Sequence, residues 1–363
     1  MTHTRTTRSL KIGQVQVGGG APVSVQSMTK TATRDAEATA CQIAELGAAG
    51  CDIVRVAVPD KDAVKALPSI LRASTLPIVA DVHFDYRLAI AAIEAGVQGV
   101  RINPGNIGAA KHVAAVAHAA RSHNIPIRVG VNAGSLEKRL RLTHGDRRAE
   151  AIVASALEQC TRLERYGATA LKVSLKASDV RTTVTACRLF AARADFPLHL
   201  GVTEAGTEPA GSIKSAVAIG ALLLDGIGDT IRVSLTGPPV REVLVGIQIL
   251  QALGLRKAAP ELISCPTCAR TKIDLIGLVA QVEAEIAKIK AAGHQIQLGT
   301  IAIMGCAVNG PGEARDADVG IAAGDGHAVL FRRGKIVRSM PENKILAALL
   351  DEIRHHTVPT GHQ

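Results

Sequence analysis

Aromatic side chains are scarce in this 363-residue chain. Trp is absent, and Phe and Tyr together make up only 2%, whereas hydrophobic residues make up 47%. Ala, Val, Ile and Leu must therefore form the core, as is typical of proteins with buried parallel strands. Four Phe and two Tyr are also too few for the base-stacking surfaces of single-strand binders. Despite the net charge of +10, we expect no nucleic-acid partner.

Long hydrophobic runs are missing as well. No apolar stretch approaches the roughly 18 residues that a membrane span requires, and residues 1–8 lack the apolar segment of a secretory signal. We therefore expect a cytoplasmic protein that does not contact membranes. In that compartment the seven cysteines are expected to be thiols or metal ligands rather than disulfides.

Strand-like and helix-like segments alternate through the first 250 residues or so. The eight strand-like runs are Pro22–Met28, Asp52–Val58, Pro77–His83, Gly99–Asn103, Pro126–Asn132, Ala170–Ala177, Pro197–Glu204 and Thr230–Leu235. Such alternation predicts a parallel sheet, and eight units in this length predict a closed (β/α)8 (TIM) barrel. An open dinucleotide-binding sheet is disfavoured, because no Gly-x-Gly-x-x-Gly follows the first run.

The pattern changes after residue 255, where Arg256–Pro260 has the composition of a linker. Beyond it, strand-like runs and two helix-period segments predict a small α+β domain. We therefore expect a barrel domain over residues 1–255 and a second domain over residues 256–363. The tail from His355 onward is expected to be frayed.

Polar residues recur on one face of the predicted barrel strands, because residues two apart share a face. They are Arg55, Asp81, His83, Arg101, Asn103, Arg128, Asn132, Lys172, Ser174, Lys176, His199, Thr203, Arg232 and Ser234. Barrel active sites lie at the carboxyl ends of the strands, and buried cations without partners are costly. Since Asp81 is the only acid in this set, the face predicts a site for a small, multiply charged phosphate or diphosphate. For any single arginine, a structural ion pair is an equally good interpretation.

Three residues on or next to this face are candidates for proton transfer. His83 and His199 could move a proton or donate a hydrogen bond to an oxyanion. Glu204 follows Thr203 with the opposite strand parity, which places it at the end of the strand as a candidate acid.

Three cysteines near the C-terminus have the spacing of a metal-cluster site. Cys265-Pro-Thr-Cys268 is followed 38 residues later by Cys306. A closed zinc site usually takes four protein ligands, whereas thiolates hold iron–sulfur clusters. Three sulfurs leave the fourth position to a weaker ligand or to a substrate. Glu313 follows a Gly-Pro-Gly turn, and taken alone it is more simply a solvated turn residue.

These segments together resemble the bacterial hydroxymethylbutenyl diphosphate synthases, the iron–sulfur enzymes of the methylerythritol phosphate route to isoprenoids. The resemblance runs from about Val15 to Leu349. Its motifs are Gln26–Thr29, Asp81–Asp85, Arg101–Gly108, Val131–Lys138, Lys176–Asp179, Thr203–Gly206, Cys265–Cys268 and Gly305–Glu313.

The resemblance implies a substrate, a cofactor and partners. The substrate would be methylerythritol cyclodiphosphate, opened and reductively dehydrated to hydroxymethylbutenyl diphosphate by two electrons from reduced flavodoxin or ferredoxin. A [4Fe–4S] cluster would be held by Cys265, Cys268, Cys306 and Glu313. The chain would form a head-to-tail homodimer, in which the cluster domain of one chain closes over the barrel of the other.

The resemblance also supports roles for individual residues. Glu204, Glu313 and His83 are the expected catalytic residues. Substrate binding is expected from Arg55, Asp81, His83, Arg101, Arg128, Asn132, Lys176, Thr203, Arg232 and Ser234. Two other functions are alternatives to this one: a phosphate-binding barrel with a structural zinc and acid–base chemistry, as in pterin-synthesising barrels, and a non-catalytic redox sensor that binds nucleic acid.

Overall fold

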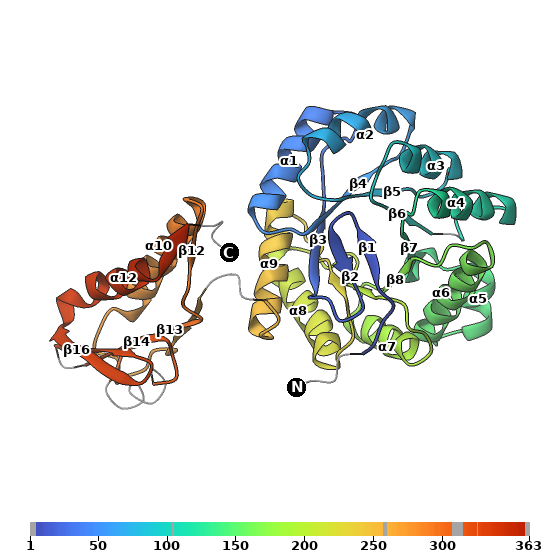
Figure 1. The fold of residues 1–363 in the computed structure, drawn as a ribbon. Coiled ribbons are helices and arrows are strands. Elements are labelled where there is room, and N and C mark those ends of the chain that lie inside the picture. Colours follow the sequence, from blue (N-terminus) through green and yellow to red (C-terminus); the bar gives the residue numbers. More distant parts are fainter. Residues whose placement is uncertain (1–4, 104, 257–259, 307–314, 325, 360–363) are drawn as a thin grey trace. The chain divides into compact units, whose positions relative to one another are not determined.

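Two compact units, Met1–Arg256 and Lys257–Gln363, make up the chain. Figure 1 shows the computed structural model, which describes residues 5–103, 105–256, 260–306, 315–324 and 326–359. In these described ranges, no helix is both long enough and apolar enough to cross a membrane.

The first unit is a barrel of eight parallel strands. They are β3 (Ser24–Met28), β4 (Ile53–Ala57), β5 (Ile78–Asp81), β6 (Gly99–Ile102), β7 (Ile127–Asn132), β8 (Leu171–Lys176), β9 (His199–Leu200) and β10 (Thr230–Ile231). Their order in the sheet is β8-β7-β6-β5-β4-β3-β10-β9. A parallel bridge between Val173 and Leu198 joins the two ends of this sheet, and the predicted TIM barrel is thereby confirmed.

Nine helices in the described part of this unit surround the barrel (Figure 1). They are α1 (Ala36–Ala48), α2 (Lys61–Ala73), α3 (Tyr86–Glu94), α4 (Ala110–Ser122), α5 (Lys138–His144), α6 (Arg148–Arg165), α7 (Val180–Ala191), α8 (Glu208–Leu224) and α9 (Pro239–Ala252). Asp35, Asp60, Asp85 and Asp179 begin four of these helices, and each carboxylate accepts a backbone N–H of the first turn. These caps satisfy amide groups that have no partner within the helix, and so they fix where the strand-to-helix loops end.

A short antiparallel hairpin precedes the barrel and was not anticipated from the sequence. Its strands are β1 (Leu10–Ile12) and β2 (Val15–Val17). Their buried side chains form one cluster with Ile53 and Val79. The hairpin therefore packs over the end of the barrel at which β4 and β5 begin, opposite the carboxyl ends of the strands.

The second unit is an α+β domain. Its described elements are β11 (Glu261–Ser264), α10 (Leu275–Ala291), β12 (His294–Ile296), β13 (Thr300–Met304), β14 (Val319–Gly324), β15 (His327–Arg332), β16 (Lys335–Pro341), α12 (Ile345–His355) and β17 (Thr357–Pro359). Five strands form a sheet in the order β11-β13-β14-β15-β16. Its main core includes Val282 and Ile286 of α10, and Leu349 and Ile353 of α12.

The expectation of a frayed tail is wrong for part of it. Thr357–Pro359 pairs antiparallel with His294–Ile296. Only six described residues, 354–359, follow Ile353, the last core residue of α12, so the tail offers little hydrophobic signal from which a strand could be predicted. Backbone pairing with β12 stabilises it instead.

Candidate functional site

A cavity of about 150 Å³ lies at the carboxyl ends of the barrel strands. Its lining consists of Arg55, Asp81, His83, Arg101, Arg128, Asn132, Ser174, Lys176, Thr203, Arg232 and Ser234. Every barrel residue named above as a substrate-binding candidate is in this lining. Strand periodicity is therefore enough to bring these positions together, because inward-facing residues of parallel strands converge on one space.

The register of the strands puts the charges in a row. Asp81 on β5 is the pairing partner of Arg101 on β6, Arg101 of Arg128 on β7, and Arg128 of Lys172 on β8. Four residues nearer the strand ends, Asn132 pairs with Lys176. Four neighbouring strands thus carry an ionic row across one wall of the barrel.

Asp81 is the one acid of the lining and pairs with two of its arginines. Its Oδ1 lies 3.0 Å from Arg101 Nη1, and its Oδ2 lies 3.5 Å from Arg55 Nε. Burial alone would raise the pKa of this carboxyl, but the positive charges of Arg55 and Arg101 hold the pKa well below its usual range. Asp81 is therefore a carboxylate at neutral pH and cannot serve as a proton donor there.

The other cations exceed what Asp81 can neutralise. Five cationic side chains line the cavity against one carboxylate. Burial, followed by repulsion from neighbouring arginines, lowers the pKa of Arg128 and of Lys176 well below their usual values. Among the described residues, Arg128 Nε and Nη1 have no hydrogen-bond partner. Such a set is stable only when an anion compensates it, so the cavity has the charge for a small polyanion.

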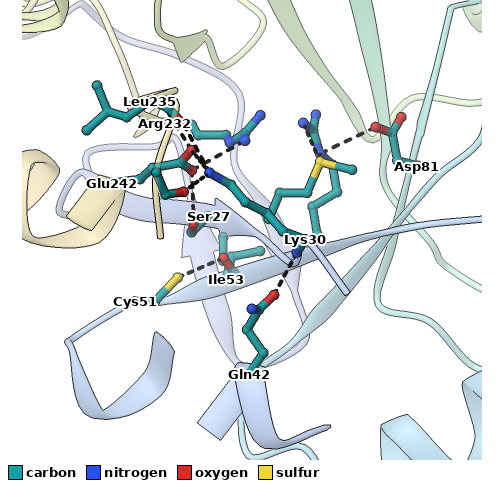
Figure 2. A network of polar contacts seen from close by, with 12 residues as sticks. Ser27, Lys30, Gln42, Cys51, Ile53, Asp81, Arg232, Leu235 and Glu242 are labelled. Carbon is teal, nitrogen blue, oxygen red and sulfur yellow. Dashed lines mark hydrogen bonds and ion pairs between the residues drawn. The ribbon is translucent and has the colours of Figure 1, made fainter. Parts of the chain in front are cut away.

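Glu242, on α9, is a buried acid that sequence reasoning missed. It is only 2% exposed, and it accepts hydrogen bonds from Ser27 Oγ at 3.3 Å and from Arg232 Nη2 at 3.3 Å. Lys30 Nζ lies 3.3 Å from its second oxygen (Figure 2). The available signal was its place on the apolar face of a helix, four residues before the buried Gly246. Glu242 orients Arg232 from behind the cavity.

Two glycines make room for the side chains of Arg101 and Lys176, because they have no Cβ. A Cβ at Gly130, between Arg128 and Asn132 on β7, would lie 2.6 Å from Arg101 Nε. A Cβ at Gly201 would lie 2.8 Å from Lys176 Nζ and would clash with the Arg232 carbonyl. Both side chains reach the cavity over backbone that lacks a Cβ.

The candidate proton-transfer residues occupy three different places. His83 lies at the cavity rim, with a half-exposed side chain, and accepts a hydrogen bond from Arg101 Nη1 at Nε2 over 2.8 Å. The same Nε2 lies 3.4 Å from Asp81 Oδ1, so that the ring contacts both members of the Asp81–Arg101 pair. Glu204 is exposed and outside the lining, but its φ of +53° is unusual for a residue other than glycine. His199 is fully buried below the cavity, with Nδ1 2.7 Å from Thr230 Oγ1.

The three cysteines lie in two loops that follow neighbouring parallel strands. Cys265 directly follows β11, and Cys306 comes two residues after β13, which pairs in parallel with β11. Cys268 N donates to Thr271 Oγ1 at 3.1 Å. The backbone N–H of Lys272 donates to the Gly305 carbonyl at 3.2 Å, which ties the first loop to the second.

The chemistry of these thiols suits a metal cluster. Cys265 and Cys268 are free thiols, and hydrogen bonding from the backbone of Arg270 lowers the pKa of Cys268, which favours the thiolate. Within the described ranges, no three His, Cys, Asp or Glu side chains already form a complete metal site. Glu313, the expected fourth ligand, lies outside the described residues. The donor set thus fits a thiolate-bound cluster.

The fold and the cavity define a class: a (β/α)8-barrel protein with a cationic cavity at the strand ends and an appended α+β domain that carries cysteines. Solved structures similar to the barrel include the dihydropteroate synthase of Xanthomonas albilineans, at a TM-score of 0.51 and 14% identity, covering 70% of this chain and 100% of that one. The enzyme from Yersinia pestis gives a TM-score of 0.51 at 11% identity, again over 70% of this chain and 100% of that one. At such identities the likeness shows the fold alone.

The chain belongs to the GcpE family. Residues 7–247 match the model of the GcpE TIM-barrel domain, and residues 261–355 match that of the GcpE protein C-terminal domain. A relative from Geobacter sulfurreducens, 4-hydroxy-3-methylbut-2-en-1-yl diphosphate synthase (flavodoxin), is 57% identical over 96% of this chain and 97% of its own length. A relative of the same name from Caldanaerobacter subterraneus subsp. tengcongensis is 52% identical over 96% and 97%. The resemblance inferred from the motifs is confirmed.

Proposed function

We propose that this chain converts methylerythritol cyclodiphosphate to hydroxymethylbutenyl diphosphate, a step of isoprenoid precursor synthesis. In this reaction one ring C–O bond to phosphate breaks and one hydroxyl leaves as water, while two electrons and two protons are taken up. The observation that carries the proposal is the cavity at the strand ends, where five cations and one carboxylate surround a space of about 150 Å³. Relatives at 57% and 52% identity bear the name of this synthase.

The cationic side chains of the cavity would hold the diphosphate. Arg128 and Lys176, which Asp81 does not compensate, are the natural partners of its two phosphates, because arginine binds phosphate oxygens in a bidentate manner. They would also stabilise the charge that develops on the diphosphate when the ring C–O bond breaks. Asp81 would keep Arg55 and Arg101 fixed in the empty and the occupied cavity.

Two residues near the cavity would move protons. His83, half-exposed at the rim, would interact with the substrate hydroxyl or its ring oxygen. Glu204 would act from the loop that follows β9, where its backbone is left-handed and where it adjoins Thr203 of the lining. Glu313 is proposed as the third catalytic residue from the resemblance alone.

Cys265, Cys268, Cys306 and Glu313 would hold a [4Fe–4S] cluster. When bound, such a cluster would supply electrons one at a time. Glu313 offers a harder oxygen ligand than the thiolates and would dissociate more readily from iron. Flavodoxin is the proposed donor, with ferredoxin as the alternative, and the net charge of +10 favours docking of an acidic carrier. Cys51, Cys160 and Cys187 form no disulfide, which agrees with the proposed cytoplasmic location.

A head-to-tail homodimer is proposed as the assembly. On α8, Ile213, Val217 and Leu224 are 67%, 55% and 62% exposed. They lie four and seven residues apart, so that they follow one face of the helix. Exposed apolar stripes of this kind are typical of contact surfaces, and a second copy of this chain is the proposed occupant.

Turnover under anaerobic conditions tests the function. The chain, reconstituted with iron and sulfide, is given methylerythritol cyclodiphosphate and a strong one-electron reductant, and the linear diphosphate is measured by mass spectrometry. We expect product together with about four irons per chain. A colourless, zinc-loaded protein without product would instead favour the zinc-containing barrel, and the redox function would be rejected.

A further inference from the structure

A second, deeper cavity lies inside the barrel, between the site described above and the N-terminal hairpin. Its volume is about 10 Å³, near the lower bound for one water-sized occupant. The polar side chains in its lining are Gln26, Arg128 and Lys172, and Ile12 of the hairpin closes it from below. Arg128 lines both cavities, whereas Lys172 lines only the deep one.

The polar groups around this deep cavity lack partners. Within the described part of the chain, no hydrogen bond reaches Lys172 Nζ, Arg128 Nε, Arg128 Nη1 or either side-chain amide atom of Gln26. Lys172 and Gln26 are each only 2% exposed, and Arg128 is 4% exposed. His199 Nε2, on β9, is also without a partner among the described residues. Buried polar groups are almost always paired. Several unpaired polar groups in one place therefore indicate a ligand.

No carboxylate of the described residues neutralises Lys172. The acid whose charge acts on it is Asp229, but both oxygens of that carboxylate are already engaged. Oδ1 accepts from Thr7 Oγ1 at 2.7 Å, and Oδ2 accepts from the Leu198 N–H at 2.7 Å. Burial and the neighbouring charge of Arg128 lower the pKa of Lys172 well below its usual value. Lys172 and Arg128 are therefore neighbours in strand register, and within the described residues neither forms an ion pair.

We propose that the deep cavity binds one monoatomic anion, a halide such as chloride, between Lys172, Arg128 and Gln26. Lys172, Arg128 and Gln26 bring the hydrogen-bond donors to a lining that is otherwise apolar, and a small acceptor that carries negative charge would pair with them. The small volume excludes phosphate, diphosphate and carboxylic acids, so this ligand differs from the polyanion of the upper cavity. A bound water would accept hydrogen bonds but would leave the two cations uncompensated. The halide fixes Arg128 from below and keeps its guanidinium available to the upper cavity.

Thermal unfolding of the full chain tests this site. Potassium chloride is compared with potassium gluconate at equal concentration, so that ionic strength is constant. We expect chloride to raise the Tm of the wild type by about 2–4 °C, because an anion that binds only the folded state stabilises it. Lys172→Met should abolish this rise. Lys176→Met is the matched control, since it removes a buried lysine that lines only the upper cavity, and it should keep the rise.

Crystals of the unaltered chain soaked in bromide give a second, independent measurement. We expect one anomalous peak below the upper cavity, in contact with Lys172 Nζ. A Tm that does not depend on chloride, an equal chloride effect in Lys172→Met, or the absence of bromide at Lys172 would each overturn the proposal. Loss of the chloride effect in Lys176→Met but not in Lys172→Met would place the halide in the upper cavity and would also overturn it.

Discussion

Arg101 reaches the cavity because the neighbouring strand leaves room for its guanidinium. Gly130 faces it from β7, and a Cβ at that position would lie 2.6 Å from Nε. Side chains do not tolerate such a contact without moving, and Arg101 is held at 3.0 Å from Asp81 on its other side. The position of one cation in the site therefore depends on the absence of one methyl group.

Replacing Gly130 by Ala should displace Arg101 and weaken binding of the cyclic diphosphate. We expect an increase in Kd of about tenfold or more, because a charged hydrogen bond contributes about 1.5–3 kcal/mol. Gly134→Ala is the control, since a Cβ there meets nothing within 4 Å. Equal Kd values for the two variants would show that Arg101 does not need this space.

The lowered pKa of Lys176 predicts that substrate binding takes up protons. Burial and nearby cations keep part of the free protein's Lys176 neutral below its ordinary pKa of about 10.5. A bound diphosphate stabilises the charged form and raises the pKa, so the complex holds more protons than the free protein. Calorimetry at pH 9 in buffers of different ionisation enthalpy should show this uptake, and Lys176→Met should reduce it. Proton release on binding would contradict the prediction that the bound diphosphate raises the pKa of Lys176.

At this scale, strand periodicity was sufficient for the cavity but not for its surroundings. Arg55, Arg128 and Lys176 could be placed because inward positions alternate along a strand. Glu242 could not, because it reaches Arg232 from a helix, where no alternation marks the contact. Nor could alternation predict that Glu204 has a left-handed backbone and lies outside the lining.

Among the elements, the N-terminal hairpin stands apart because it belongs to no β/α unit. Each of its strands has three residues, too few for a periodic signal. The sequence-based strand limits also exceed β9 and β10, which have two residues each. Beyond them the backbone turns to form the cavity rim, with Gly201 at a φ of +149° and Glu204 at +53°. The alternation of inward and outward residues therefore does not predict the irregular backbone at the functional end of the barrel.

Ile12→Ala tests the structural importance of the hairpin. Ile12 is 2% exposed and packs with Ile53 and Val79. Its truncation should lower the free energy of unfolding by about 2–5 kcal/mol through the lost burial and the cavity that remains. Urea unfolding measures this change, with Lys11→Ala, an exposed position on the same strand, as the control. If both variants unfold at the same urea concentration, the hairpin does not stabilise the barrel.

In the whole molecule, the proposed substrate cavity lies in one compact unit and the proposed cluster-binding cysteines lie in the other. The boundary lies between Arg256 and Lys257. Arg256 is fixed to the barrel by Asp52, with Nη1 2.7 Å from Oδ2, so that the connection to the second unit starts from a defined point. Because the cavity and the cysteines lie in separate units, the cavity of one chain could form a complete site with the cysteines of another chain.

Mixing two inactive variants tests the head-to-tail arrangement. Arg128→Ala disables the barrel, and Cys306→Ala disables the cysteine domain. If each site combines the barrel of one chain with the cysteines of its partner, a mixed dimer contains one intact site. Unfolding and refolding an equal mixture should then restore about a quarter of wild-type activity, since half of the dimers are mixed. No recovery would mean that each chain forms its site from its own two units.

The most direct test of the central claim is a calorimetric titration of methylerythritol cyclodiphosphate into the oxidised, cluster-loaded chain without reductant. The cationic cavity at the strand ends predicts one binding site per chain, weakened by added salt, and an affinity at least about tenfold lower in Arg128→Gln. Absence of binding to the wild type, or an unchanged affinity in Arg128→Gln, would contradict the assignment of this cavity to the substrate.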